Sequence, residues 1–347
     1  MSKHLYIAYT GGTIGMKMTS EGYAPVPGYL QALMSDMPEF KHAALPRYTI
    51  HEYTPLLDSS NMMPADWRLI GGDIAANYDR YDGFVVLHGT DTMAYTASAL
   101  AFMLQGLQKP VILTGSQIPL CEVRSDAHDN LITSLLIAAD SSVPEVGLYF
   151  GNKLLRGCRS TKVSADGFEA FASPNYPSLG VAGVDIRINA EFVRRRPTEA
   201  ATLTVPEMSP ATVGLLWLFP GISAEMVSQI LQPPVRGVIL AVYGVGNGPD
   251  RDKRLLAALR EATDRGVVIV ACTQCLQGTV NLHDYATGSA LARAGVVSGF
   301  DMTTEAALTK MLYLFGIGCS PEQVVAKMQA SLCGELTPAI DPRRHAG

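Results

Sequence analysis

Two patterns of hydrophobic and polar positions alternate along the first half of the chain. Short, nearly all-apolar runs are typical of strands covered on both faces, whereas longer amphipathic segments are typical of helices. The apolar runs predict strands at residues 5–9, 83–87, 111–114 and 146–150. The amphipathic segments predict helices at residues 97–107 and 125–139. Either Ser125 or Asp126 is placed to cap the second of these helices.

The same alternation resumes near residue 213. It predicts strands at residues 213–219, 238–242 and 267–271 and helices at residues 224–231, 253–265, 305–315 and 321–332. This strand–helix rhythm favours a mainly parallel sheet with helices packed on its faces.

A polar stretch with three prolines between residues 197 and 210 separates the two halves and has no sustained period. Such a composition is typical of a connection between domains. The chain has 347 residues, more than one hydrophobic core usually organises. We therefore expect an α/β protein of two α/β domains, joined by a linker at 192–211. The amino-terminal domain (1–191) is the larger, with a mainly parallel, flavodoxin-like sheet, and the carboxy-terminal domain covers 212–347.

Composition and charge exclude several classes of protein. Hydrophobic residues make up 48% of the chain and charged residues 17%, as in a packed globular enzyme. The net charge of −5 argues against broad binding to nucleic acid, and the basic run Arg194, Arg195 and Arg196 fits a solvated linker. The amino terminus lacks the pattern of a secretion signal, and no apolar segment is long enough to span a membrane. We expect a cytoplasmic protein that binds neither nucleic acid nor membrane.

The six cysteines are scattered along the chain and are not spaced as a small disulfide framework. Cys272 and Cys275 have the spacing of a metal or redox pair, but a zinc site needs further ligands and only His283 lies nearby. Because the pair follows a buried-strand pattern, we interpret both as ordinary strand-end cysteines. We expect no metal.

Glycines and hydroxyl-bearing residues follow three predicted strands of the first domain. The motifs are Thr10-Gly11-Gly12-Thr13-Ile14-Gly15, His88-Gly89-Thr90-Asp91-Thr92 and Thr114-Gly115-Ser116-Gln117. Ligands of an open parallel sheet bind outside the carboxyl ends of its strands, so chemistry is expected at this edge. The first motif lacks the spacing of a dinucleotide-binding loop and the lysine of a phosphate loop. Taken alone, it fits a tight structural turn as well as a binding loop.

The first two motifs together resemble the bacterial L-asparaginase family, most closely its type I, cytoplasmic branch. The resemblance extends to Arg159-Ser160-Thr161-Lys162-Val163, Gly244-Val245-Gly246-Asn247-Gly248 and Gly334-Glu335-Leu336-Thr337-Pro338. It implies an amidohydrolase that converts L-asparagine to L-aspartate and ammonia through a threonine acyl-enzyme, with weak glutaminase activity as a further expectation.

The resemblance also implies roles for individual residues. Thr13 matches the nucleophile, and Tyr23 matches a tyrosine of the mobile active-site loop that contacts it. Thr90, Asp91 and Lys162 match a second catalytic cluster that assists attack and activates water. Residues implied in substrate binding are Asp58, Ser59, Ser60, Thr90, Asp91 and Asn247.

The chemistry of these groups fits such roles. A threonine hydroxyl is a weak nucleophile at neutral pH, so another group must accept its proton. Burial of Lys162 would favour its neutral form and Asp91 its charged form, so a proton relay and an orienting ion pair both stay open. A backbone N–H near Thr90 is a natural donor to the oxyanion. No metal or organic cofactor is needed. His88 has no role in the resemblance, and we interpret it as a hydrogen-bonded structural histidine.

Two features of the second domain follow from the resemblance. The segment of Asn247 reaches the active site of a neighbouring subunit, which implies a homo-oligomer, either a dimer or a tetramer built from dimers. Type I enzymes can also carry a regulatory asparagine site, and Thr161, Thr273 and Cys275 match it. Ala241 stands where an arginine is expected to hold the effector's carboxylate, so we do not expect strong allosteric activation.

Two other functions stay open. The amidotransferase subunit that supplies ammonia for tRNA-bound glutamate has an additional amino-terminal domain, whereas the first motif here begins within the first dozen residues. A non-catalytic amino-acid sensor would keep the pocket without turnover, but the chain retains every polar residue that hydrolysis needs.

Overall fold

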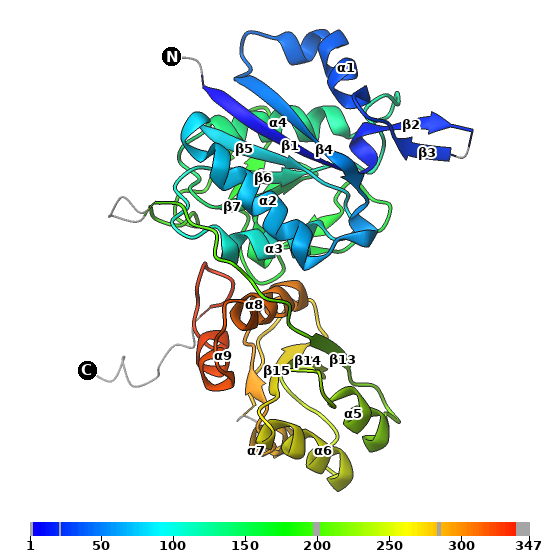
Figure 1. The fold of residues 1–347 in the computed structure, drawn as a ribbon, viewed down its shortest axis with the longest axis vertical. Coiled ribbons are helices and arrows are strands. Elements are labelled where there is room, and N and C mark those ends of the chain that lie inside the picture. The colour runs from blue at the N-terminus through cyan, green and yellow to red at the C-terminus, as the bar shows by residue number, and fades with distance from the viewer. Residues whose placement is uncertain (1–2, 21, 197–201, 283–285, 338–347) are drawn as a thin grey trace. The chain divides into compact units, whose positions relative to one another are not determined.

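The computed structural model describes residues 3–20, 22–196, 202–282 and 286–337. Residues 197–201 of the expected linker, His283 and Pro338 of the last motif lie outside the described residues. The chain divides into two compact units, Met1–Val205 and Pro206–Gly347 (Figure 1).

The first unit begins with a strand and is built largely on one sheet. Its strands are β1 (His4–Gly11), β2 (Met16–Thr19), β3 (Gly22–Pro25), β4 (Arg47–Leu57), β5 (Gly83–Leu87), β6 (Val111–Thr114), β7 (Val146–Phe150), β8 (Lys153–Arg156), β9 (Thr161–Lys162), β10 (Phe171–Ala172), β11 (Gly180–Ala182) and β12 (Ile186–Ile188). Its α-helices are α1 (Tyr29–Asp36), α2 (Pro64–Asn77), α3 (Met93–Met103) and α4 (Ala127–Ala139). Short 3₁₀ helices lie at η1 (Thr13–Gly15), η2 (Pro38–Lys41), η3 (Ser59–Asn61), η4 (Tyr78–Arg80) and η5 (Gly157–Arg159).

Within the described residues, the main sheet has eight strands in the order β12-β11-β8-β7-β6-β5-β1-β4. The strands from β7 to β4 are parallel, and β8, β11 and β12 extend the sheet with antiparallel pairs. Taken in chain order, the parallel strands follow the 2-1-3-4-5 arrangement of flavodoxin-like sheets. The predicted α/β fold with a mainly parallel first sheet is confirmed.

The side chains of β1 alternate between two apolar layers. Tyr6 and Ala8 belong to the core cluster that contains residues of α2 and α3, whereas Leu5 and Ile7 belong to the cluster that contains residues of α1 and α4. Figure 1 shows the helices on the two faces of this sheet. Burial on both faces explains why the central strands are apolar throughout.

The structure differs from the sequence prediction at several elements. The expected helix at 97–107 is α3, which begins four residues earlier, at Met93, and ends at Met103, just before Gly106 takes a φ of 79°. An apolar surface all round this buried helix hides the position of its first turn. The pattern also did not predict β4, an edge strand on which exposed polar residues such as Arg47 and His51 interrupt any apolar run.

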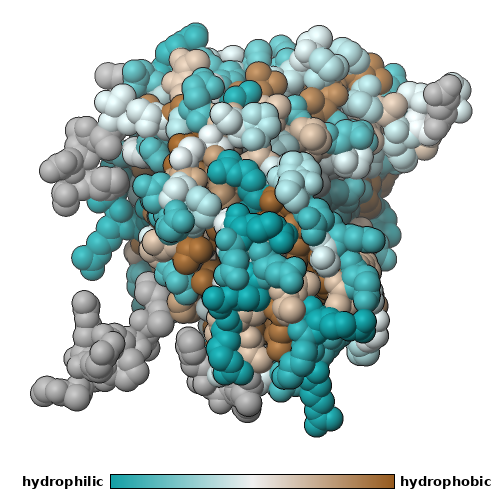
Figure 2. All heavy atoms as spheres, turned by 60° about the horizontal axis from the view of Figure 1, so that its bottom comes forward, coloured by the Kyte–Doolittle hydropathy of each residue, from teal (hydrophilic) through white to brown (hydrophobic). Residues whose placement is uncertain are grey.

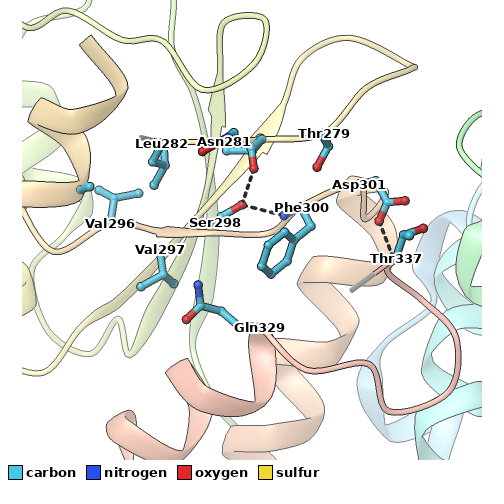
Figure 3. A pocket seen from close by; sticks show the side chains of 12 residues that line it. Thr279, Asn281, Leu282, Val296, Val297, Ser298, Phe300, Asp301, Gln329 and Thr337 are labelled. Atoms are coloured by element: carbon cyan, nitrogen blue, oxygen red, sulfur yellow. Dashed lines mark hydrogen bonds between the residues drawn. The ribbon is translucent and has the colours of Figure 1, made fainter. Parts of the chain in front are cut away.

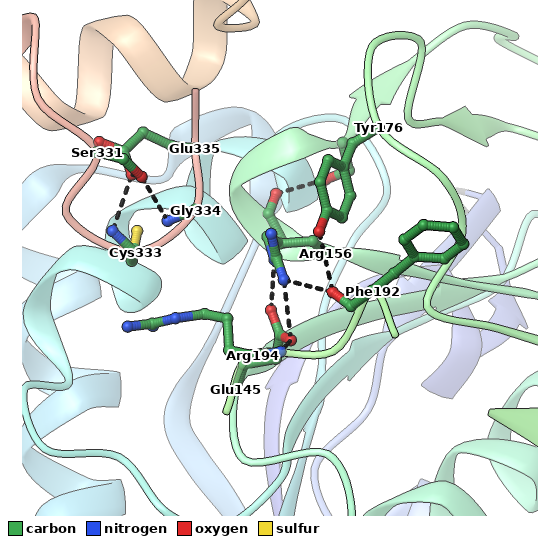
Figure 4. A network of polar contacts seen from close by, with 11 residues as sticks. Glu145, Arg156, Tyr176, Phe192, Arg194, Ser331, Cys333, Gly334 and Glu335 are labelled. Atoms are coloured by element: carbon green, nitrogen blue, oxygen red, sulfur yellow. Dashed lines mark hydrogen bonds and ion pairs between the residues drawn. The ribbon is translucent and has the colours of Figure 1, made fainter. Parts of the chain in front are cut away.

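A buried ion pair anchors the chain after β12 to the first unit (Figure 4). Arg156 Nε donates to Glu145 Oε2 at 2.6 Å, and the guanidinium carbon lies 4.4 Å from the centroid of the Tyr176 ring. Arg156 Nη2 also donates to the Phe192 carbonyl, and the Arg194 N–H donates to Glu145 Oε1. Residues 192–194 are therefore held by the first unit.

The second unit is a smaller α/β structure. Its elements are β13 (Val213–Trp217), α5 (Ala224–Ile230), β14 (Gly237–Val242), α6 (Lys253–Asp264), β15 (Val268–Thr273), α7 (Ala286–Arg293), β16 (Val297–Ser298), α8 (Thr304–Gly316) and α9 (Pro321–Met328). The order β13-β14-β15-β16 is parallel throughout. Residues of α5 and α6 share a core cluster with one side of the sheet, and α8 lies against β14, where Met311 and Phe315 approach Gly237.

Polar side chains predominate on one face of the protein (Figure 2). Figure 2 shows polar side chains over most of the face in view, with hydrophobic residues in small, separated groups. No helix in the described part of the chain is long and apolar enough to cross a membrane.

A second buried ion pair closes the end of the second unit. Lys310 of α8 donates to Glu335 Oε1 at 2.5 Å, and both side chains are fully buried. Glu335 also accepts the backbone N–H groups of Leu332 and Cys333, and Figure 4 shows it within this loop. This packing explains why α9 ends at Met328 and not at the predicted residue 332.

We predict that Glu335→Gln lowers the free energy of unfolding by about 3–5 kcal/mol, because it leaves the buried ammonium of Lys310 without its counter-charge. Denaturant titration of the purified protein measures the change. Glu169→Gln is the matched control, since it breaks an exposed pair with Lys153 and is expected to change stability little.

The same pair predicts a pH dependence. Burial alone would raise the pKa of Glu335, but Lys310 and the backbone N–H groups of Cys333 and Leu332 hold it below its usual value. A lowered folded-state pKa stabilises the protein above the unfolded value of about 4.3 and loses that contribution as the pH falls through the folded pKa. Below about pH 4, wild type should therefore lose more stability than Glu335→Gln. Parallel pH profiles for the two proteins would contradict this.

Candidate active site

Three neighbouring strands deliver the polar motifs to one edge of the main sheet. β1, β5 and β6 are parallel neighbours, so their carboxyl ends lie together. The strand order reverses between β1 and β5, which is the position where ligands bind in open sheets of this type. Thr13 follows β1, Thr90 follows β5 and Ser116 follows β6.

The loops after β1 and β5 touch backbone to backbone. Gly12 has a φ of 91°, and a Cβ built on it would lie 2.5 Å from the Gly89 nitrogen. A Cβ on Gly89 would lie 2.4 Å from Ser59 Oγ, in the segment after β4. Only glycine fits at both positions. Thr13, Thr90 and Ser59 are consequently brought to one place.

Thr90, Asp91 and Lys162 form a hydrogen-bonded cluster. Lys162 Nζ, from β9, donates to Thr90 Oγ1 at 2.8 Å and to Asp91 Oδ1 at 2.8 Å. Thr90 is buried, whereas the Asp91 side chain is 64% exposed and that of Lys162 20% exposed. The cluster therefore lies at the boundary between the core and solvent, where a small molecule can reach the carboxylate.

Gln117 is a further member of this cluster. The sequence alone assigned Gln117 no role. Its Oε1 accepts from Thr90 Oγ1 at 3.4 Å, and its Nε2 donates to the carbonyls of Ala165 and Gly167. The Gln117 N–H donates to Asp126, which therefore holds the loop after β6 in place. Ser125 Oγ accepts the first N–H of α4. The place of Gln117 directly after β6 was the only sequence signal.

The residues expected to bind the substrate's head group lie in η3 and just before it. Ser59 is buried, and its carbonyl accepts from Thr92 Oγ1 at 2.7 Å. Asp58 is exposed and accepts the N–H of Ser60 at 3.0 Å. The segment is thus fixed to the loop after β5 through the bond from Thr92.

Tyr23 lies on the hairpin of β2 and β3 and points to a different partner from the one expected. Its hydroxyl donates to Glu122 Oε1 at 2.7 Å, and its side chain is largely exposed. This hydrogen bond raises the pKa of Tyr23. No hydrogen bond joins Tyr23 to Thr13 in the part of the chain that the structure describes. Glu122, 99 positions away in sequence, carried no signal.

Two buried side chains line the inner side of the site. His88 is 1% exposed, and burial lowers its pKa to about 4. Its Nδ1 faces the Gly89 carbonyl and its Nε2 faces Thr96 Oγ1, so neither ring nitrogen is left to take a proton from Thr13. Ser116 is also 1% exposed, and its hydroxyl has no hydrogen-bond partner among the described residues. An unpaired buried hydroxyl at this edge is a group that a bound polar molecule can satisfy.

The remaining predicted residues lie elsewhere in the fold. Asn247 is in the second unit, where its Oδ1 accepts from Thr287 at 2.6 Å. Thr273 Oγ1 accepts the Cys275 N–H at 3.1 Å, and Ala241 is fully buried in β14. Thr161 belongs to the first unit, in β9 beside Lys162.

The two cysteines of the Cys272–Cys275 pair lie in different environments. Cys272 is buried in β15, and burial raises its pKa to about 12, whereas Cys275 is exposed. Among the described residues, no three His, Cys, Asp or Glu side chains are grouped so that they could hold a metal ion.

The second unit also contains a cavity of about 700 Å³. Figure 3 shows Phe300 and Asp301 at its wall, with Asp301 accepting the Thr337 N–H at 2.7 Å. All the residues that line this cavity belong to the second unit, so the cavity does not include the cluster of Thr90, Asp91 and Lys162.

The chain is similar to known proteins over nearly its whole length. Residues 4–194 match the family model for asparaginase, N-terminal, and residues 212–328 match that for the glutaminase/asparaginase C-terminal domain. L-asparaginase 1 of Escherichia coli (strain K12) is 54% identical over 337 residues, which cover 97% of this chain and 98% of that protein.

Two further relatives extend this comparison. The crystal structure of L-asparaginase I from Vibrio cholerae matches with a TM-score of 0.90 and 52% identity, and covers 97% of this chain and 100% of that chain. The 60 kDa lysophospholipase of Homo sapiens is 47% identical over 366 residues, covering 99% of this chain and 63% of that protein. On the strength of both family models and these full-length similarities, this chain belongs to the asparaginase family.

Proposed function

We propose that this chain is a cytoplasmic enzyme that hydrolyses L-asparagine to L-aspartate and ammonia, with Thr13 as its nucleophile. The observation that carries the proposal is the contact of Gly12 with Gly89, which sets the loop of Thr13 directly against the loop of Thr90. The similarity to L-asparaginase 1 of Escherichia coli supports the choice of substrate.

In the first half of the proposed reaction, Thr13 Oγ attacks the carbon of the side-chain amide. The Thr90 N–H stabilises the resulting oxyanion, and ammonia leaves with the proton that Thr13 gives up. Tyr23 closes over Thr13 from its hairpin, a movement that requires its exposed bond to Glu122 to break. The product of this half is an ester between Thr13 and the aspartyl group.

In the second half, water attacks the ester carbon, the bond to Thr13 Oγ breaks, and the proton that the water gives up returns to Thr13 as aspartate leaves. Lys162 acts as an orienting cation, because it donates at once to Thr90 and Asp91 and so fixes their relative positions. Thr90 in turn directs the water, with its own proton held toward Gln117. No metal or organic cofactor takes part in either step.

The proposed substrate-binding groups divide by charge. Asp91 faces solvent and binds the ammonium group of asparagine, while Ser59 and exposed backbone N–H groups hold its carboxylate. Asp58 and Ser60 complete the wall of the site. Asn247 of a neighbouring subunit contributes the last contact, so the active form is a dimer or a tetramer of dimers.

We predict that Thr13→Ala lowers kcat for asparagine by at least about a thousandfold while aspartate still binds, because only the attacking oxygen is removed. Ammonia release and calorimetric titration with aspartate measure the two quantities. Thr13→Ser keeps a hydroxyl and should retain measurable turnover. Substantial ammonia release by Thr13→Ala would move the nucleophile to another residue, and absence of turnover in the wild type would favour a sensor.

We predict that kcat/KM for asparagine exceeds that for glutamine by about tenfold or more, since one methylene changes transition-state binding by about 1–3 kcal/mol. We also expect a hyperbolic saturation curve. The proposed regulatory site at Thr161, Thr273 and Cys275 lacks a cation on β14, where Ala241 is buried. Initial rates over a range of both amides check both points. A sigmoidal asparagine curve would show that the regulatory site works without the arginine.

The exposed side of β13 supports the proposed oligomer. Leu215 and Trp217 of the edge strand β13 are 44% and 50% exposed, and Phe219, two residues after its end, is 42% exposed. They alternate with the buried Leu216 and Leu218, so the three side chains project to the same side. A row of large apolar side chains on an edge strand is typical of an interface between proteins.

We predict that Trp217→Asp lowers both the mass measured by light scattering and the activity, because it places a charge in this apolar row and removes Asn247 from the neighbouring site. Val184→Asp, at a fully exposed position in the first unit, is the control and should change neither. An unchanged assembly in Trp217→Asp would place the interface elsewhere.

A further inference from the structure

A continuous chain of hydrogen bonds runs from the core to the loop after β5. Trp67 of α2 donates its Nε1–H to Thr96 Oγ1 of α3 at 3.2 Å, and Thr96 Oγ1 lies 2.9 Å from His88 Nε2. On the other side of the ring, His88 Nδ1 lies 2.7 Å from the Gly89 carbonyl oxygen. All of these side chains are buried.

The direction of each bond is fixed by chemistry. A carbonyl oxygen only accepts, so Nδ1 of His88 carries the hydrogen. The neutral ring then accepts at Nε2, which requires the Thr96 hydroxyl to donate. Trp67 can only donate, and it fills the acceptor position of the Thr96 oxygen. Burial, which lowers the pKa of His88 to about 4, keeps this single arrangement in place at neutral pH.

The chain ends on the peptide group that joins Gly89 to Thr90. The carbonyl that accepts from His88 belongs to the same peptide as the Thr90 N–H. Thr90 is 8% exposed, and its N–H has no protein acceptor among the described residues. A hydrogen bond to a carbonyl polarises its peptide and makes the attached N–H a stronger donor.

We propose that His88 is a positioning residue: together with Thr96 and Trp67, it polarises and orients the Gly89–Thr90 peptide so that the Thr90 N–H stabilises the oxyanion of the tetrahedral state. The inference rests on the proposed function, which requires such a donor. Anchorage matters here because Gly89 has no side chain of its own to hold the loop, and Ser59 Oγ occupies the place of its missing Cβ. α2 and α3 supply the rigid support.

The first test is His88→Leu, which removes the donor to the Gly89 carbonyl. We expect kcat for asparagine to fall about tenfold and KM to change less than about twofold, since the lost interaction acts on the transition state. This decrease in kcat is smaller than the decrease of about a hundredfold or more that follows removal of an oxyanion donor itself. His88→Asn keeps an N–H donor close to the position of Nδ1 and should restore most of kcat.

A second variant tests the chain without altering the ring. Thr96→Val removes the hydroxyl that donates to Nε2, so the ring is less polarised and its Nδ1–H becomes a weaker donor to the Gly89 carbonyl. We expect kcat to fall about threefold. Ser98→Ala is the matched control, because it removes a buried hydroxyl of the same helix. Among the described residues, that hydroxyl donates to the carbonyls of Ala94 and Gly157 and not toward Gly89. The thermal stability of this variant should fall while kcat stays at the wild-type value.

The outcomes separate this inference from the proposed function. An inactive Thr13→Ala together with full kcat in folded His88→Leu and Thr96→Val would overturn only the role of His88. The role of His88 would also be overturned if Ser98→Ala and Thr96→Val had the same melting temperature and lost the same share of kcat. The loss of kcat would then follow stability alone. Turnover by Thr13→Ala would overturn the proposed function itself.

Discussion

The site depends on the close approach of two glycine backbones. β1 and β5 are neighbours in the sheet, but the chain after β1 leads to α1 on one face and the chain after β5 leads to α3 on the other. The two connections therefore diverge and leave a crevice at the edge of the sheet. Gly12 and Gly89 form the floor of this crevice. Their backbones are in direct contact, which leaves no room for a side chain at either position. This tight contact brings Thr13 and Thr90 close enough for the shared substrate of the proposed reaction.

Charge is distributed across the site according to burial. Behind the floor, the side chains of His88, Thr96 and Trp67 are neutral and fully paired, as the core requires, since a buried charge without a partner is strongly unfavourable. In front of it, Lys162 and Asp91 carry the charges where water still reaches them. In the proposed reaction, a substrate with an ammonium and a carboxylate would meet fixed dipoles on its inner side and the partly exposed ion pair on its outer side.

Rigidity and movement are also assigned by burial. The ion pairs Glu145–Arg156 and Lys310–Glu335 are buried and hold the ends of their units in single positions. The bond between Tyr23 and Glu122 is exposed, and bonds of this kind exchange readily with water. The closing movement that we propose for Tyr23 therefore needs only this exposed bond to break.

The sequence by itself determined the parallel α/β fold and the position of the polar motifs. Strands covered on both faces must be apolar throughout, which is why β5, β6 and β7 have the bounds that the pattern predicts. The polar edge strand β4 escaped the same reasoning. Only the tertiary structure decided the partners: Glu122 for Tyr23, Gln117 for Thr90, and the chain behind His88. These residues are far apart in sequence or belong to different elements, and a hydrogen bond between them exists only once the sheet and its helices have set their distance and direction.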